Sequence, residues 1–191
     1  MMVTIVISAA VLNFFGSSYY IWNTLIGVTK PNRVTFLLWA VAPLIGAAAA
    51  FSSGVTWATL SVFVSGMMPL LIFLSSFVNP NSYWELRPFD YWCGALSALA
   101  LILWLITKQP VLAIIFAIAS DFLAGVPTAI KAWRHPETET ATGYATAAIS
   151  NASSFLVMKQ FTFVNYAFPA YLVVFCVYLT FAIVRKRIGF E

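Results

Sequence analysis

A single aspartate, Asp121, stands inside a long apolar part of the sequence and has the clearest potential for chemistry. It follows Pro110 by eleven residues in a predicted span that ends near Lys131, so we expect it close to mid-membrane. An ionised acid there costs about 2.5–3.5 kcal/mol on insertion scales, so such residues face a protein interior or a wet cavity. Because burial favours the protonated carboxyl, Asp121 suits a proton carrier or a cation-sensitive switch. The alternative is a structural acid that fixes helix packing through a hydrogen bond.

Three further residues are candidates for contact with a solute. Asn151 lies about midway along a predicted span over 141–159, at a depth matching that of Asp121, and we predict that the two side chains line one central cavity. That span is rich in Ala, Ser and Thr, which permits either close helix packing or a lumen, and the sequence leaves both open. Asn13 and Trp39 are weaker candidates, and Trp39 could either stack on a substrate ring or be a core residue.

Groupings that support enzymatic or metal chemistry are missing from the sequence. Cys93 and Cys176 fall in separate predicted spans, so they indicate neither a disulfide framework nor a metal site. The one histidine, His135, lies in a charged loop, where it cannot serve as the base for a buried serine. Aspartyl proteolysis within a membrane needs paired carboxylates, and only Asp121 is expected at depth. We therefore expect no enzyme, no cofactor and no metal.

The composition is that of a membrane protein. Of the 191 residues, 62% are hydrophobic and 8% are charged, and the mean hydropathy is +0.91. A soluble domain carries about 25% charged residues, which keep its surface solvated. The net charge of +4 comes from basic residues between apolar stretches, and no clustered basic face indicates nucleic-acid binding.

Seven apolar stretches are each long enough to cross a bilayer, which takes roughly 20 residues of helix. The first begins without a basic region and is too long for a cleaved signal peptide, so we interpret it as a span. The predicted fold is an all-α polytopic membrane protein with seven transmembrane helices. They run approximately over 4–26, 33–52, 55–78, 90–107, 110–131, 141–159 and 162–184.

Basic residues near the span ends predict the orientation, because they concentrate on the cytoplasmic side. With the N-terminus outside and the C-terminus in the cytoplasm, only Lys108 and Lys159 face outward. The predicted location is a cell membrane, crossed several times, of the bacterial inner-membrane type. The predicted cytoplasmic cations are Lys30, Arg33, Arg87, Lys131, Arg134, Arg185, Lys186 and Arg187.

Charges cluster in one predicted cytoplasmic loop. Lys131 and Arg134 end the fifth span, where cations suit the negative end of the helix dipole. Glu137 and Glu139 precede the sixth span, where anions suit the positive end. We interpret these four residues as helix-end charges and His135 as a solvated loop histidine.

A repeat is visible in the spacing. Residues 22–40 match residues 127–145 at an offset of 105, and at the same offset Gly16 meets Asp121. Identical pairs at that offset are Pro31 with Pro136, Thr35 with Thr140 and Ala40 with Ala145. A single linking span between two three-helix units makes the units parallel. The predicted domains are 1–78 for the first repeat, 79–108 for the linker helix and 109–191 for the second repeat with its basic end.

With this architecture, orientation and repeat spacing, the chain resembles the SWEET/PQ-loop clan of seven-helix membrane transporters, which includes the MtN3-like sugar facilitators. The positions of that clan's Pro-Gln dipeptide hold Pro127–Thr128 in the second repeat and Trp22–Asn23 in the first, so the motif match is partial and no Pro-Gln dipeptide occurs. The resemblance implies that Pro127 is a hinge for alternating access and that an acid in the fifth helix, here Asp121, couples protons.

The leading functional prediction is a transporter or facilitator for a small polar metabolite such as a sugar or an amino acid. Pro43, Pro69 and Pro169 are expected to kink their helices and act as further hinges. The expected partners are the lipid bilayer and a small-molecule substrate, with assembly into a homo-oligomer left open. The alternative is a seven-helix protein that binds a ligand or partner without transport, as the KDEL receptors of similar fold do.

Overall fold

The computed structural model describes residues 2–51 and 57–185, and these residues form helices and no strand. The all-α prediction is therefore confirmed. Three single-turn 3-10 helices accompany the α-helices: η1 (Pro80–Ser82), η2 (Pro136–Thr138) and η3 (Ser154–Leu156). The seven α-helices are α1 (Met2–Leu25), α2 (Arg33–Phe51), α3 (Trp57–Ser75), α4 (Pro88–Ile106), α5 (Pro110–Arg134), α6 (Ala141–Ser153) and α7 (Phe163–Val184).

Four of these helices are long and apolar enough to cross a membrane: α1 over Thr4–Leu25, and α4, α5 and α7 over their full lengths. This finding, made on the described residues, confirms a membrane protein. Shorter apolar stretches cover Arg33–Ile45 of α2 and Phe63–Ser75 of α3. A count of seven membrane crossings stays a prediction.

Helix α6 is shorter than predicted, because it ends at Ser153 and not near residue 159. Its last residues bond to their own backbone: Asn151 Nδ2 donates to the carbonyl of Ala147 at 2.8 Å, and Ser153 Oγ to that of Ser150 at 2.7 Å. Such local bonds compete with the helix ladder and favour its end. Asn151 therefore lies near the end of α6, and its predicted place midway along a span is wrong.

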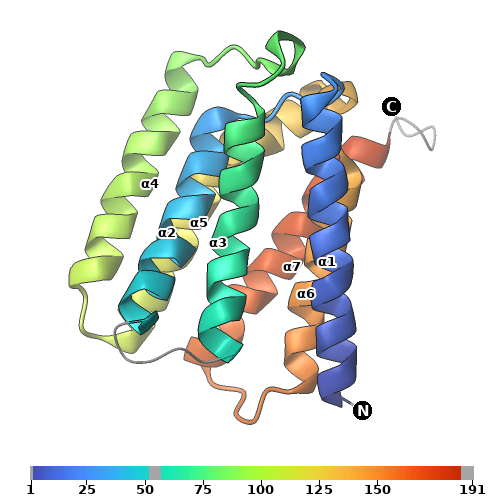
Figure 1. The fold of residues 1–191 in the computed structure, drawn as a ribbon. Helices are drawn as coiled ribbons and strands as arrows, with labels where there is room; N and C mark the ends of the chain where they lie inside the picture. Colours follow the sequence, from blue (N-terminus) through green and yellow to red (C-terminus); the bar gives the residue numbers. More distant parts are fainter. Residues whose placement is uncertain (1, 52–56, 186–191) are drawn as a thin grey trace.

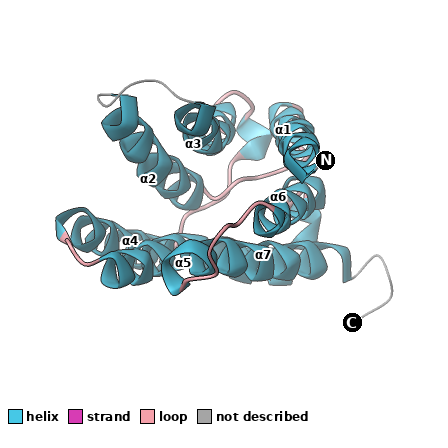
Figure 2. Ribbon diagram, turned by 90° about the horizontal axis from the view of Figure 1, so that it is seen from below, coloured by secondary structure: helices cyan, strands magenta, loops and turns pink. Residues whose placement is uncertain are grey.

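The helices form two groups with matching contacts. Within the first group α3 packs against both α1 and α2, and within the second α7 packs against both α5 and α6. Between the groups, α1 packs against α6 and α2 against α5. The linking helix α4 packs against α5 and α2. Seen from below, α1, α2 and α3 lie on one side and α4, α5 and α7 on the other (Figure 2).

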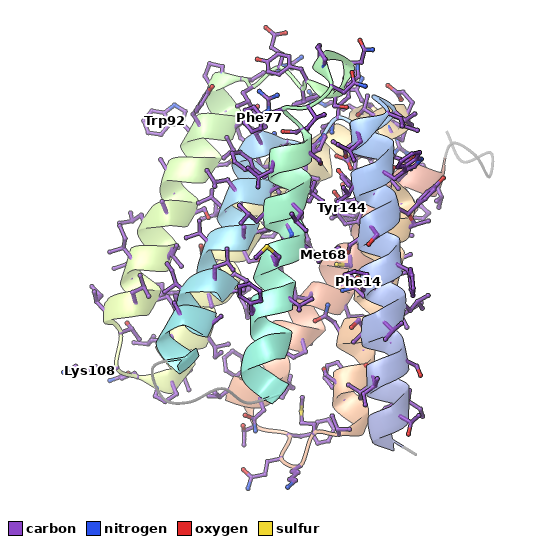
Figure 3. All side chains as sticks on the ribbon, viewed as in Figure 1. Phe14, Met68, Phe77, Trp92, Lys108 and Tyr144 are labelled. Atoms are coloured by element: carbon purple, nitrogen blue, oxygen red, sulfur yellow. The ribbon has the colours of Figure 1, made fainter. Side chains whose placement is uncertain are left out.

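The two ends of the bundle differ in charge. The loops before α2, α4 and α6 lie at the end opposite the N-terminus, together with the end of α7 (Figure 1). We call this the basic end. Lys108 lies at the other end, far from Phe77 and Trp92 (Figure 3). Lys186 and Arg187 lie outside the described residues. The basic end carries Lys30, Arg33, Arg87, Lys131, Arg134 and Arg185.

The buried core joins the two groups through aromatic rings. The ring of Tyr20 on α1 lies 5.3 Å from that of Phe36 on α2 and 5.8 Å from that of Tyr144 on α6. Leu179 and Ile183 of α7 complete the same buried cluster. Because aromatic side chains bury large areas, this cluster ties α1 and α2 to α6 and α7.

The contact between α1 and α6 depends on a glycine at position 16. A Cβ added to Gly16 would lie 2.1 Å from Thr146 Oγ1, whereas one added to Gly143 in the same interface would lie 3.4 Å from Tyr20 Cδ2. We expect Gly16→Ala to lower the free energy of unfolding by about 1–3 kcal/mol through overpacking. Gly143→Ala is the matched control and should raise it by up to about 1 kcal/mol, because alanine loses less backbone entropy in a helix. Unfolding in detergent micelles measures both, and equal effects would contradict the close contact.

Candidate functional site

Asp121 lies at the middle of α5, where α2 and α7 meet it. Its Oδ2 accepts a hydrogen bond of 2.8 Å from the hydroxyl of Tyr171 on α7. Its backbone carbonyl accepts one of 3.1 Å from Nε1 of Trp39 on α2. Asp121, Trp39, Tyr171 and Phe175 form what we call the Asp121 site. Two of the predicted site residues, Asp121 and Trp39, are thus brought together.

Aromatic rings form the walls of the Asp121 site. The Phe175 ring stacks on Tyr171 with centroids 5.6 Å apart and meets the Trp39 ring edge-on at 6.2 Å. Gly125, one turn after Asp121, makes this packing possible. A Cβ added there would lie 2.6 Å from Phe175 Cζ and 2.9 Å from Trp39 Cζ2. The carboxyl therefore lies beside a packed aromatic cluster, and among the described residues Tyr171 is its one hydrogen-bond partner.

Two serines join α5 to α4 through reciprocal hydrogen bonds. Ser97 Oγ donates to the carbonyl of Ser120 at 2.7 Å, and Ser120 Oγ donates to the carbonyl of Ser97 at 2.9 Å. Both serines are buried. Hydroxyl bonds of this kind join helices in apolar surroundings. They fix α5 at the residue that immediately precedes Asp121.

The other predicted solute contacts lie elsewhere. Asn13 Oδ1 accepts a hydrogen bond of 3.3 Å from Thr146 Oγ1, which places it in the contact between α1 and α6. The side chain of Asn151 donates within α6. In the described part of the chain no hydrogen bond joins Asp121 to either asparagine, so a cavity shared by Asp121 and Asn151 stays a prediction.

All four predicted hinge prolines, Pro43, Pro69, Pro127 and Pro169, lie inside helices. A proline cannot donate the helix hydrogen bond and clashes with the carbonyl four residues earlier, which weakens the helix at that point. Pro127 is buried two residues after Gly125, between the Asp121 site and the basic end. Its position on α5 suits a hinge, and that role stays a prediction.

Hydrogen bonds to threonine hydroxyls join the two groups of helices in two places near the basic end. Thr128 Oγ1 donates to Thr35 Oγ1 at 2.9 Å, and Asn23 Nδ2 donates to Thr140 Oγ1 at 3.0 Å. In both contacts a residue of the first helix of one group meets the second helix of the other, at Thr35 within α2 and at Thr140 immediately before α6. The two contacts are related by the offset of 105, since Asn23 corresponds to Thr128 and Thr35 to Thr140.

A buried ion pair at the basic end was missed by sequence reasoning. Lys131 Nζ lies 2.7 Å from Glu139 Oε1, and the two side chains are 2% and 0% exposed. Tyr20 and Tyr144 donate their hydroxyls to Glu139 Oε2 at 2.7 and 3.2 Å. Lys131 also donates to the carbonyl of Lys30. We call these residues the basic-end network. The interpretation of Lys131 and Glu139 as simple helix-end charges is therefore incomplete.

The basic-end network joins both groups of helices. Tyr20 comes from α1, Lys131 from α5 and Tyr144 from α6, and the backbone N–H of Lys30 donates to the carbonyl of Thr138 at 3.0 Å. A buried ion pair of this kind is costly to break, because removing one partner leaves an unpaired charge in the interior. The network therefore ties the two groups of helices together at this end of the bundle. His135, by contrast, is exposed beside Glu137, as predicted for a loop histidine.

Comparison with protein-family models, curated proteins and solved structures finds no match for the chain. Cys93 and Cys176 are both buried and free. Within residues 2–51 and 57–185, no three side chains of His, Cys, Asp or Glu come together as a metal site would require. Function must therefore be inferred from the Asp121 site and the basic-end network themselves.

Proposed function

We propose that the chain is a membrane transporter or facilitator for a small polar solute, such as a sugar or an amino acid, and that Asp121 carries a coupled proton. One observation carries the proposal. The carboxyl at the middle of α5 accepts a hydrogen bond from Tyr171 of α7, and the backbone carbonyl of the same residue accepts one from Trp39 of α2. Acids at this depth in membrane helices mark substrate pathways and proton relays. This one lies where the two groups of helices meet.

Protonation of Asp121 would change how α5 is attached to α7. The ionised carboxylate only accepts hydrogen bonds, so it holds the hydroxyl of Tyr171 as a donor. The protonated acid also carries a donor of its own and can bond a solute hydroxyl or carbonyl. Proton uptake and solute contact are thereby linked at one side chain, which is the requirement for coupling.

The helix contacts support two parallel repeats joined by α4. Each group has its third helix between the other two, and the contacts between groups pair α1 with α6 and α5 with α2. The contacts of Thr128 with Thr35 and of Asn23 with Thr140 follow the repeat offset. This arrangement favours the resemblance to the SWEET/PQ-loop clan and a two-fold axis along the membrane normal. Transport would then require the basic-end network to separate and re-form.

A ligand screen followed by uptake tests the proposal. The purified protein is heated in detergent with sugars, amino acids and nucleosides, because a ligand that binds the folded state raises the melting temperature. A solute identified in this way is then offered, radiolabelled, to proteoliposomes. Uptake above that of empty liposomes supports transport. Binding without uptake would favour the alternative of a receptor-like protein.

The proposed orientation, with the N-terminus outside, predicts which loops are reachable from each side. Single cysteines at Lys30 and Arg134 should react with an impermeant reagent only after the cytoplasmic side is exposed, because positive loops stay in the cytoplasm. A cysteine at Lys108 should react from outside. Labelling of intact and broken cells in a background without Cys93 and Cys176 measures this. Reaction at Lys30 and Lys108 from the same side would rule the topology out.

A further inference from the structure

A pocket opens on the outer surface of the bundle at the basic end, between α5 and α7. It has a volume of about 370 Å³ and is lined by Ile130, Trp133, Arg134 and Tyr178. The three uncharged side chains are 38%, 43% and 39% exposed, so the pocket faces outward from the helices and away from the Asp121 site. Three apolar or aromatic walls with one cation at the rim make an amphipathic surface.

Arg185 packs against the aromatic side of this pocket. The rings of Trp133 and Tyr178 are nearly parallel, with an angle of 5° and centroids 6.3 Å apart. The guanidinium of Arg185 lies 3.8 Å over the Trp133 ring and donates to the carbonyls of Trp133 and Ala182. Arg185 is buried, and its Nε has no hydrogen-bond partner among the described residues. A second positive charge therefore stands next to the pocket.

Arg134 is the part of the pocket that is free to bind. It is exposed at the end of α5, and within the described ranges it has no hydrogen-bond or ion-pair partner. The neighbouring carboxylates are engaged elsewhere, since Glu139 pairs with Lys131 and Glu137 lies beside His135. A guanidinium presents paired donors that match the oxygens of a phosphate.

We propose that this pocket binds one anionic phospholipid, with its phosphate on Arg134 and the start of an acyl chain along Ile130 and Tyr178. Helix α5 is one of the four that can cross a membrane, and Arg134 is its last residue, so the pocket lies at headgroup level. Tryptophan and tyrosine favour that level, and basic pockets between membrane helices attract acidic headgroups. The apolar walls select a lipid over a free phosphate. This inference does not depend on transport.

Native mass spectrometry of the detergent-purified protein tests the site with two lipids of identical acyl chains, phosphatidylglycerol and phosphatidylcholine. We expect phosphatidylglycerol to be retained preferentially, and Arg134→Gln to reduce its retention about fivefold, the effect expected of one surface cation. Lys108→Gln is the matched control at the opposite end (Figure 3) and should leave retention unchanged. Tyr178→Ala should weaken the binding of both lipids, because it removes one aromatic side of the pocket. Melting temperatures confirm that each variant is folded.

Several results would overturn the proposal. Equal retention of the two lipids by the unaltered protein would show that charge plays no part. Equal loss in Arg134→Gln and Lys108→Gln would show that net charge alone matters. Full competition by soluble glycerol phosphate would show that the apolar walls do not contribute.

Discussion

Asp121→Asn is expected to abolish solute accumulation driven by a pH gradient in proteoliposomes, while downhill exchange of solute continues. Asparagine keeps the size of the side chain and can still accept from Tyr171, but it cannot bind or release a proton. The measurement is uptake of a radiolabelled solute with and without an imposed gradient. Loss of accumulation to the level of the gradient-free control would support proton coupling at this residue.

Tyr171→Phe is the matched control for that experiment. It removes the hydroxyl that bonds Asp121 Oδ2 but leaves the carboxyl and the ring that stacks on Phe175. Coupled accumulation should therefore persist in Tyr171→Phe, with a changed dependence on pH. If Asp121→Asn leaves accumulation and its pH dependence as in the unaltered protein, Asp121 is a structural acid and the chain is an uncoupled facilitator.

Glu139→Gln is expected to cause the largest loss of stability, about 3–5 kcal/mol in the free energy of unfolding. The substitution keeps the shape of the side chain but leaves the charge of Lys131 buried without its partner. Replacing both residues, in Lys131→Met with Glu139→Gln, removes the isolated charge and should recover most of the loss. Denaturant unfolding in micelles, arranged as a double-mutant cycle, measures the coupling between the two side chains.

Glu137→Gln provides the matched control at the same end. Glu137 lies 3.5 Å from His135, but the two side chains are 65% and 47% exposed, so solvent screens the interaction. Little change in stability is expected. A Glu139→Gln protein as stable as Glu137→Gln would contradict a buried ion pair between Lys131 and Glu139.

The helices were largely predictable because local signals define them. Apolar stretches ended by proline, glycine and charge gave boundaries within a few residues for α1, α2, α5 and α7. The end of α6 was not predictable from hydropathy, because there the hydroxyl and amide side chains bond back to their own helix. Composition alone does not distinguish such bonds from polar residues in a continuing span.

The candidate sites were predictable only in part. Asp121 could be found because an acid in an apolar span is rare, and Trp39 because tryptophan is large and amphipathic. Tyr171 gave no such signal, since the chain has eight tyrosines and the partner of each is decided by packing. The burial of Lys131 and Glu139 likewise depends on Tyr20 and Tyr144, which come from distant parts of the chain. Contacts between remote segments leave no mark in local sequence.

If Asp121 carries a proton with the solute, the packing of Gly16 against Thr146 limits how many protons each solute molecule brings with it. At the sequence offset of 105 Gly16 corresponds to Asp121, and even a Cβ there would lie 2.1 Å from Thr146 Oγ1. Position 16 therefore has no room for an acid, and the proposed cycle would carry one proton per solute, on Asp121. A pH difference of one unit corresponds to about 1.4 kcal/mol per proton. With one proton per solute, each unit of pH difference across the membrane could therefore concentrate a neutral solute at most about tenfold. This protein would suit a solute that is already plentiful outside the cell.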